Sequence, residues 1–122
     1  MSHQHKLFYY GLILTGLSIA LHALGHHALQ RVLTDSKLSM YQTASTYLLW
    51  GGTWIMLLGI ARQHFYLSPF GIALILIGII LFCGSLLLYI LIPTPILMMI
   101  TPIGGISMIF GFLICGIQHR KT

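Results

Sequence analysis

Four long apolar runs divide the chain, and short polar stretches separate them. The runs extend from Leu7 to Leu29, from Ala44 to Ala61, from Leu67 to Ile92 and from Ile96 to Ile117. Each is close to the roughly 20 residues that an α-helix needs to cross a bilayer. The prolines in Ser68-Pro69 and Pro93-Thr94-Pro95 favour breaks between the later runs, because proline does not continue a helix. The pattern predicts an all-α, integral membrane four-helix bundle, with residues 1–122 forming a single transmembrane domain.

Small or weakly polar residues recur at helical spacing on every run, and we expect them to lie between helices. They are Gly11, Thr15, Ser18, His22 and His26 on the first run, Ser45, Gly52 and Gly59 on the second, Gly71, Gly78 and Ser85 on the third, and Gly104, Ser107, Gly111 and Cys115 on the fourth. In lipid, helices associate through close contacts and interhelical hydrogen bonds, which such residues permit. Pro102 lies within the fourth run and predicts a kink, because it removes a backbone donor.

The composition supports a membrane location and narrows the chemistry. Hydrophobic side chains make up 57% of the 122 residues and charged side chains 6%, far from the roughly 25% charged residues of soluble domains. Asp35 is the only acid, so catalysis by paired carboxylates cannot be built from this chain alone. The formal charge of +5 comes from scattered Lys and Arg residues, which suits anionic lipid better than nucleic acid. The expected partners are therefore the lipid bilayer and a membrane protein or further copies of the chain, but not nucleic acid.

Four spans would place both termini on one side of the membrane. Lys6, Arg62, Arg120 and Lys121 belong to that side, and Arg31 and Lys37 to the other. The positive-inside rule then favours a cytoplasmic location for both termini. We interpret the first run as a span and not as a cleaved signal peptide, because its apolar core is longer than the typical 7–15 residues or so of such peptides.

Three histidines near the end of the first run are the main candidates for chemistry, because an ionisable residue inside a membrane segment is by default a functional-site hypothesis. His22 and His26 are four residues apart and share a helix face. His27 points about 100° away from His26. The spacing of the first two is used by zinc-binding helices, but two ligands alone do not complete a site.

Two uses of these histidines compete with simple packing. Cys83 is the one further ligand expected at the depth of His22, so His22, His26 and Cys83 are the candidates for a metal site. Alternatively, His22, His26, Ser85 and Thr101 line a small polar cavity that could hold a proton or a small ligand. An interhelical hydrogen-bonding role is favoured over both, and we expect no metal or cofactor. Haem held by two histidines on facing helices would need a second copy of the chain.

Three motifs resemble those of a known family. They are Gly-His-His-Ala-Leu at the end of the first run, Leu81-Phe-Cys-Gly-Ser-Leu86 in the third and Ile100-Thr-Pro-Ile-Gly-Gly105 in the fourth. Over nearly the whole chain, the sequence resembles the small inner-membrane proteins of the YgdD and YwdK type, whose function is unknown. The resemblance implies a four-span protein of the bacterial plasma (inner) membrane. It is carried by Gly25, His27, Gly84, Ser85, Thr101, Pro102, Gly104 and Gly105, whereas His22 and His26 fall outside the family's pattern.

The predicted function is that of a non-enzymatic accessory or assembly subunit that acts through membrane partners. One alternative is a component that transports a proton or a small solute. Another is a redox subunit associated with a metal or haem. An enzyme is the least favoured class, because the chain lacks a convincing pair of nucleophile and base and a cofactor motif.

Overall fold

Four long helices make up most of the chain. The computed structural model describes residues 3–118, so Arg120 and Lys121, assigned above to the side of the termini, lie outside the described residues. The helices are α1 (His3–His27), α2 (Asp35–Ala61), α3 (Pro69–Leu91) and α4 (Pro95–Ile117), and the short 3-10 helix η1 (Leu29–Arg31) follows α1. All four long helices are long and apolar enough to cross a membrane. The prediction of an all-α, four-helix membrane protein is confirmed.

Local side chains explain where α2 and α3 begin. The Thr34 hydroxyl accepts a hydrogen bond from the Lys37 backbone N–H at 3.3 Å, and Asp35 supplies negative charge in the first turn, which favours a helix N-terminus. This cap starts α2 at Asp35, well ahead of the apolar run that begins at Ala44. Ser68 caps α3 in the same way by accepting from the Gly71 N–H at 3.3 Å, and Pro69 suits the first helical position.

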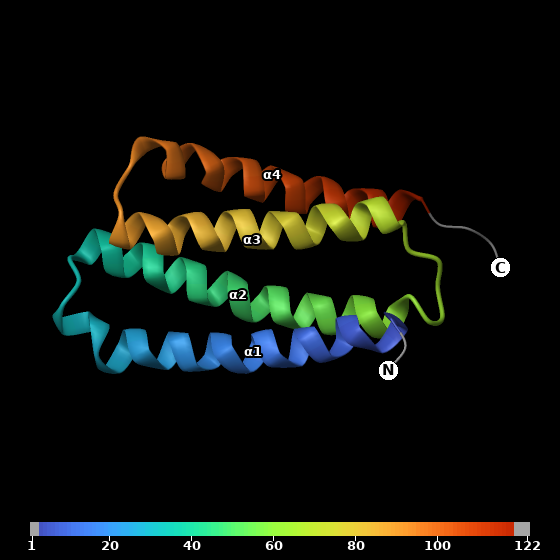
Figure 1. The fold of residues 1–122 in the computed structure, drawn as a ribbon, viewed down its shortest axis with the longest axis horizontal. Helices are drawn as coiled ribbons and strands as arrows, with labels where there is room; N and C mark the ends of the chain where they lie inside the picture. The colour runs from blue at the N-terminus through green and yellow to red at the C-terminus, as the bar shows by residue number, and fades with distance from the viewer. Residues whose placement is uncertain (1–2, 119–122) are drawn as a thin grey trace.

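The helices form a bundle of two closely packed pairs. α1 packs along α2, and α3 packs along α4, while a smaller interface between α2 and α3 joins the two pairs. The four helices lie side by side in chain order, with α2 and α3 in the middle (Figure 1). The start of α1, the connection between α2 and α3 and the end of α4 all lie at one end of the bundle (Figure 1).

Glycines bring the backbones of paired helices into contact. A Cβ atom on Gly52 would lie 2.7 Å from the Thr15 backbone nitrogen, and one on Gly104 would lie 2.5 Å from the Phe82 backbone nitrogen. Real Cβ atoms do not approach a backbone so closely, so any side chain at these positions would force the helices apart. The expectation that small residues lie between helices is confirmed for Gly11, Gly52, Gly59, Gly71, Gly78, Gly104 and Gly111.

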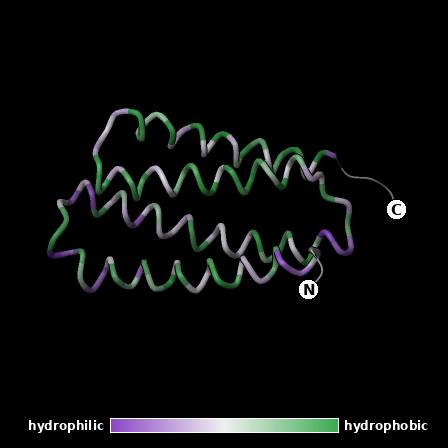
Figure 2. Tube along the Cα trace, in the orientation of Figure 1, coloured by the Kyte–Doolittle hydropathy of each residue, from purple (hydrophilic) through white to green (hydrophobic). Residues whose placement is uncertain are grey.

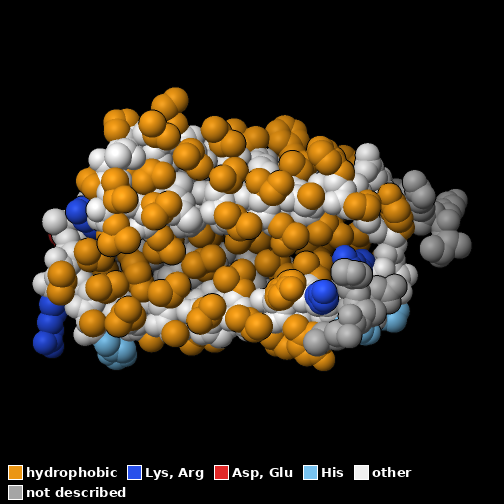
Figure 3. Space-filling view, in the orientation of Figure 1, with side chains coloured by type: hydrophobic (Ala, Val, Ile, Leu, Met, Phe, Trp, Pro, Cys, Tyr) orange, Lys and Arg blue, Asp and Glu red, His pale blue; other side chains and the backbone are white. Residues whose placement is uncertain are grey.

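The outer surface is suited to lipid. Hydrophilic residues gather at the two ends of the bundle and in the connections, whereas the helices between them are mainly hydrophobic (Figure 2). Hydrophobic side chains cover the visible face over all four helices, and Lys and Arg side chains lie near its ends (Figure 3). The structure thus has an apolar band between two polar ends, the arrangement that a bilayer requires.

Pro102 lies inside α4, and the helix continues through it from Pro95 to Ile117. The Thr101 hydroxyl donates to the Leu97 carbonyl oxygen at 3.2 Å, which adds a hydrogen bond beside the residue that has no N–H to offer. The kink expected at this proline stays a prediction.

Candidate functional site

A chain of hydrogen bonds ties the end of α1 to α2. The His22 Nδ1 atom lies 2.9 Å from the Ser45 Oγ atom, and the Ser45 hydroxyl donates to the Gln42 carbonyl oxygen at 3.2 Å. One helical turn earlier on α2, the Tyr41 hydroxyl donates to the Leu21 carbonyl oxygen at 2.5 Å. Ser45 is completely buried. The favoured interhelical role of His22 is therefore present in the structure, with Ser45 as its partner.

His22 also contacts His26. Their Nε2 atoms are 3.3 Å apart, and the two rings meet edge to face, with their centroids separated by 4.8 Å. His22 is half-buried and His26 is exposed. His27, which follows on the next position of the helix, is also exposed and does not belong to this pair. The structure brings His22 and His26 together, as their spacing predicted.

Ser85 and Thr101 form a second polar pair, between α3 and α4. Their hydroxyl groups are hydrogen-bonded to each other, and each also contacts a carbonyl oxygen of its own helix. Ser85 Oγ lies 3.0 Å from the Phe82 oxygen, and Thr101 Oγ1 lies 3.2 Å from the Leu97 oxygen. The pair links the two helices at the level of Pro102.

The four residues proposed to line one polar cavity thus form two separate pairs, one in each pair of helices. Between the described residues, no hydrogen bond joins His22 or His26 to Ser85 or Thr101. Thr101 does border a cavity of about 230 Å³, and neither histidine lines it. The other residues around this cavity are Met40, Leu86, Tyr89, Met98 and Pro102.

The structure separates Cys83 from the histidines. Cys83 is 1% exposed and packs in the apolar core that includes Ile79 and Met108. Within residues 3–118, no three His, Cys, Asp or Glu side chains converge so that they could hold a metal ion. His22, His26 and Cys83 therefore do not form one ligand set. Cys83 and Cys115 are both free and buried.

The remaining motif residues have different surroundings. A Cβ atom on Gly25 would lie 2.7 Å from the Tyr41 ring, so this glycine makes room for the tyrosine that bonds to α1. Gly104 touches the α3 backbone, and Gly105 has only ordinary contacts with the Phe82 ring. A Cβ atom on Gly84 would meet nothing within 4 Å. Pro102 is exposed.

An aromatic surface across α2, α3 and α4 was missed by sequence reasoning. The Tyr47 ring meets Phe82 with a centroid separation of 4.9 Å, and Trp54 meets Phe112 at 4.9 Å. Trp50 packs on Trp54 at 6.0 Å. We call these five rings the aromatic cluster. All of them except Trp50 border a groove of about 260 Å³, which is lined by Tyr47, Trp54, Phe82, Gly105, Met108, Ile109 and Phe112. The spacing of Tyr47, Trp50 and Trp54 along one helix was the signal that could have revealed it.

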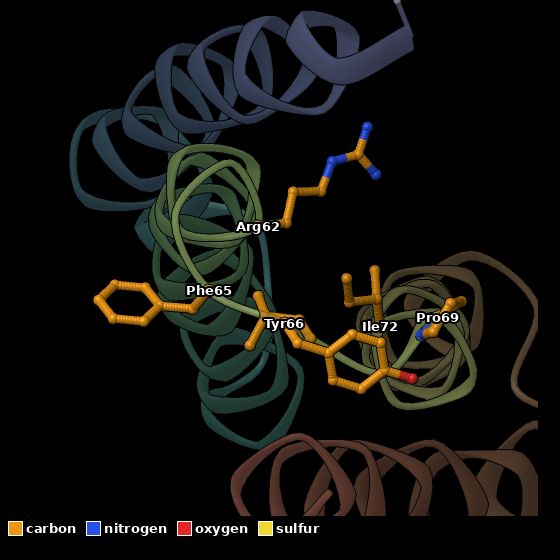
Figure 4. A pocket seen from close by; sticks show the side chains of 6 residues that line it. Arg62, Phe65, Tyr66, Pro69 and Ile72 are labelled. Atoms are coloured by element: carbon orange, nitrogen blue, oxygen red, sulfur yellow. The ribbon is translucent and has the colours of Figure 1, made fainter. Parts of the chain in front are cut away.

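A second hollow lies at the connection between α2 and α3. It has a volume of about 390 Å³ and is lined by Arg62, Phe65, Tyr66, Leu67, Pro69 and Ile72. The Tyr66 ring extends toward Pro69, and the Arg62 side chain extends to another side of the connection (Figure 4). Apolar rings beside a cation suit the boundary between lipid tails and headgroups.

Comparison with known proteins identifies the family. Residues 21–105 match the model of a protein family of unknown function, DUF423. The chain belongs to the DUF423 family. It is 32% identical over 106 residues to a UPF0382 membrane protein of Staphylococcus aureus, and the match covers 86% of this chain and 87% of the relative. A UPF0382 membrane protein of Staphylococcus haemolyticus is 32% identical over 112 residues, with coverage of 91% and 92%. No solved structure matches.

Membership of DUF423 confirms the resemblance inferred from the three motifs. The match encloses α2 and α3 completely, together with both histidines of the pair, and it ends at Gly105 in α4. It therefore includes four of the five rings of the aromatic cluster and omits Phe112. This DUF423 protein is a multi-pass membrane protein, and the relatives are also named as membrane proteins.

Proposed function

We propose that this protein is a non-enzymatic accessory or assembly subunit that binds a transmembrane helix of another membrane protein through its aromatic cluster. The observation that carries the proposal is the position of Trp50. It lies near the middle of the 27-residue helix α2 and is 55% exposed. In membrane proteins, tryptophan is enriched at the two interfaces with water, so an exposed one in mid-span calls for a partner other than lipid.

The indole N–H groups strengthen this argument. Among the contacts of the described residues, neither Trp50 nor Trp54 donates its indole N–H to an acceptor, and their rings contact other aromatic rings instead. An unsatisfied donor is costly in hydrocarbon. A partner helix that carries a serine, threonine or amide side chain would supply the missing acceptor. Gly105, which lines the groove, has no side chain and leaves room for a close approach of that helix.

The internal polar groups support a structural role and not a reactive one. Ser45, Ser85 and Ser107 are each hydrogen-bonded to a helix backbone or to another side chain. Among the described residues, no buried side-chain nitrogen or oxygen lacks a partner. Groups engaged in this way hold helices together and are not held ready for proton transfer or for a solute.

Photocrosslinking in native membranes tests this function. We expect Trp50→p-benzoylphenylalanine to give a discrete heteromeric adduct on a denaturing gel after irradiation. Ile19→p-benzoylphenylalanine is the matched control, because Ile19 is 57% exposed on α1 and lies outside the cluster. It should give no adduct of that size. Adducts of equal yield at both positions, or a homodimer or monomer alone from position 50, would contradict the proposal.

We also propose that the protein lies in the bacterial plasma membrane with both termini in the cytoplasm. Lys6 and Arg62 belong to one end of the bundle, and Arg31 and Lys37 to the other. The bacterial relatives support the choice of membrane. The positive-inside rule supports the orientation when Arg120 and Lys121, which come after α4 in the sequence, are counted with Lys6 and Arg62.

Cysteine labelling in intact cells tests the orientation. In a variant with Cys83 and Cys115 replaced by alanine, Gln30→Cys is expected to react with a membrane-impermeant maleimide added outside, because Gln30 is exposed in η1. His64→Cys, exposed in the opposite connection, should react only after the cells are permeabilised. The reverse pattern would place both termini outside.

A further inference from the structure

We propose that His22 and His26 bind one Zn²⁺ ion through their Nε2 atoms, at the end of α1 next to η1. This inference does not rest on the proposed function, and it uses only α1 and its contacts with α2. The spacing of the two histidines predicted that they share a helix face, but not how their ring nitrogens are placed. The structure adds three observations, which concern the distance between the two nitrogens, the hydrogen bonds behind His22 and the exposure of His26.

The distance between the two ring nitrogens fits a shared zinc ion. Zinc binds histidine nitrogen at about 2.0–2.1 Å, so two such nitrogens around one tetrahedral ion lie about 3.3–3.4 Å apart. The Nε2 atoms of His22 and His26 are 3.3 Å apart. Their rings are inclined at 71° to each other, so the two rings are not stacked face to face. The ion needs no rearrangement of the helix, because both ligands belong to consecutive turns of α1.

The hydrogen bonds behind His22 place its free lone pair on the correct nitrogen. The Ser45 hydroxyl uses its hydrogen to donate to the Gln42 carbonyl oxygen, so Ser45 Oγ accepts from His22 Nδ1–H. Neutral histidine has one N–H, and the Nε2 atom of His22 is therefore unprotonated and faces His26. A hydroxyl or carbonyl behind a metal-binding histidine fixes its tautomer in this way.

Zinc would replace a hydrogen bond. With His22 in this tautomer and no metal bound, the contact between the two Nε2 atoms is a hydrogen bond from His26 Nε2–H to the lone pair on His22 Nε2. When zinc binds, it takes the lone pairs of both Nε2 atoms, and His26 carries its hydrogen on Nδ1 instead. Both rings stay neutral, so no net proton is released. His26 is exposed, and its Nδ1–H can then be hydrated at the end of the helix.

Water completes the coordination. No third His, Cys, Asp or Glu of residues 3–118 converges on the pair, and the exposure of His26 leaves the outer side of the ion open. Two protein ligands and two waters make an exchangeable site and not a closed structural one. Zinc is expected to bind less tightly here than in a four-ligand site, and a chelator should remove it without unfolding the bundle.

Titration of the purified full-length protein with Zn²⁺ against a chromophoric zinc indicator tests the site. The protein is prepared without a polyhistidine tag. His3, His5 and His119 are replaced by alanine so that the imidazoles near the termini do not contribute to zinc binding. We expect one Zn²⁺ per chain. His26→Ala should weaken binding at least tenfold, and the exposure of His26 keeps the fold intact. His27→Ala is the matched control on the same helix and should bind as before.

Ser45→Ala separates the proposed site from unspecific binding by imidazole. It leaves both ligands in place but removes the group that orients His22, so affinity should fall about 10-fold or more, as when other such supporting groups are lost. Circular dichroism should report unchanged helix content for this variant. The proposal fails if no zinc binds, if His26→Ala binds normally, or if His27→Ala weakens binding as much as His26→Ala does.

Discussion

Gly104→Ala is expected to destabilise the protein by about 1–3 kcal/mol, the typical cost of an overpacked core. The added Cβ atom would lie 2.5 Å from the Phe82 backbone nitrogen and 3.0 Å from the Gly78 carbonyl oxygen. Neither neighbour is a flexible side chain, so α3 and α4 must separate. The measurement is the midpoint of unfolding when the protein, purified in mild detergent, is titrated with a denaturing detergent and followed by circular dichroism.

The next residue, Gly105, provides a matched control that is not expected to lose stability. A Cβ atom on Gly105 would lie 3.7 Å from the Phe82 ring, an ordinary contact. Within a helix, alanine is more favourable than glycine by about 1 kcal/mol. Gly105→Ala is therefore expected to leave stability unchanged or to raise it. If both variants lose stability equally, the loss in Gly104→Ala does not come from the close contact between α3 and α4 at Gly104.

Tyr41→Ala is expected to destabilise the protein by about 3–5 kcal/mol, the usual cost of removing a large buried ring. Tyr41 is 6% exposed. Its ring fills the space beside Gly25, and its hydroxyl donates to the Leu21 carbonyl oxygen. The alanine variant loses both contacts and leaves α1 less firmly held to α2. Its unfolding midpoint in the same detergent titration measures the loss.

Two further variants separate the contribution of the Tyr41 ring from that of its hydroxyl and control for the loss of an exposed tyrosine. Tyr41→Phe keeps the ring and loses only the hydrogen bond, so it should cost about 1 kcal/mol. Tyr10→Ala removes a tyrosine that is 60% exposed, and its effect on stability should be small. An equal loss for Tyr41→Phe and Tyr41→Ala would mean that the hydroxyl, and not ring packing beside Gly25, holds the two helices together.

The sequence was sufficient to predict the helices and the contact between His22 and His26. Both follow from properties of a single helix, namely its apolar length and the spacing of its residues. The glycines at helix contacts were also predictable, because close approach in lipid requires small residues whatever the partner. Gly52 and Gly104 are examples, and both lie against a neighbouring backbone.

The partners across helices were not predictable in the same way. In a water-soluble protein, polar residues mark the outer face of a helix. Here the lipid and the protein core are both apolar, so the hydrophobic pattern of a helix does not reveal which of its faces points toward the core. Ser45 as the partner of His22 and the meeting of Tyr47 with Phe82 depend on such rotations. The same limit explains why His22 and Ser85, once expected around one cavity, belong to different helix pairs.

The pairing of α1 with α2 and of α3 with α4 has a consequence for how the protein enters the membrane. Each pair consists of consecutive spans joined by a short connection, so its close contacts form between segments that are near in sequence. The first hairpin can assemble in the bilayer while the ribosome is still synthesising the second. Because the interface between α2 and α3 is smaller than those within the pairs, we expect it to form last, when the second hairpin docks on the first.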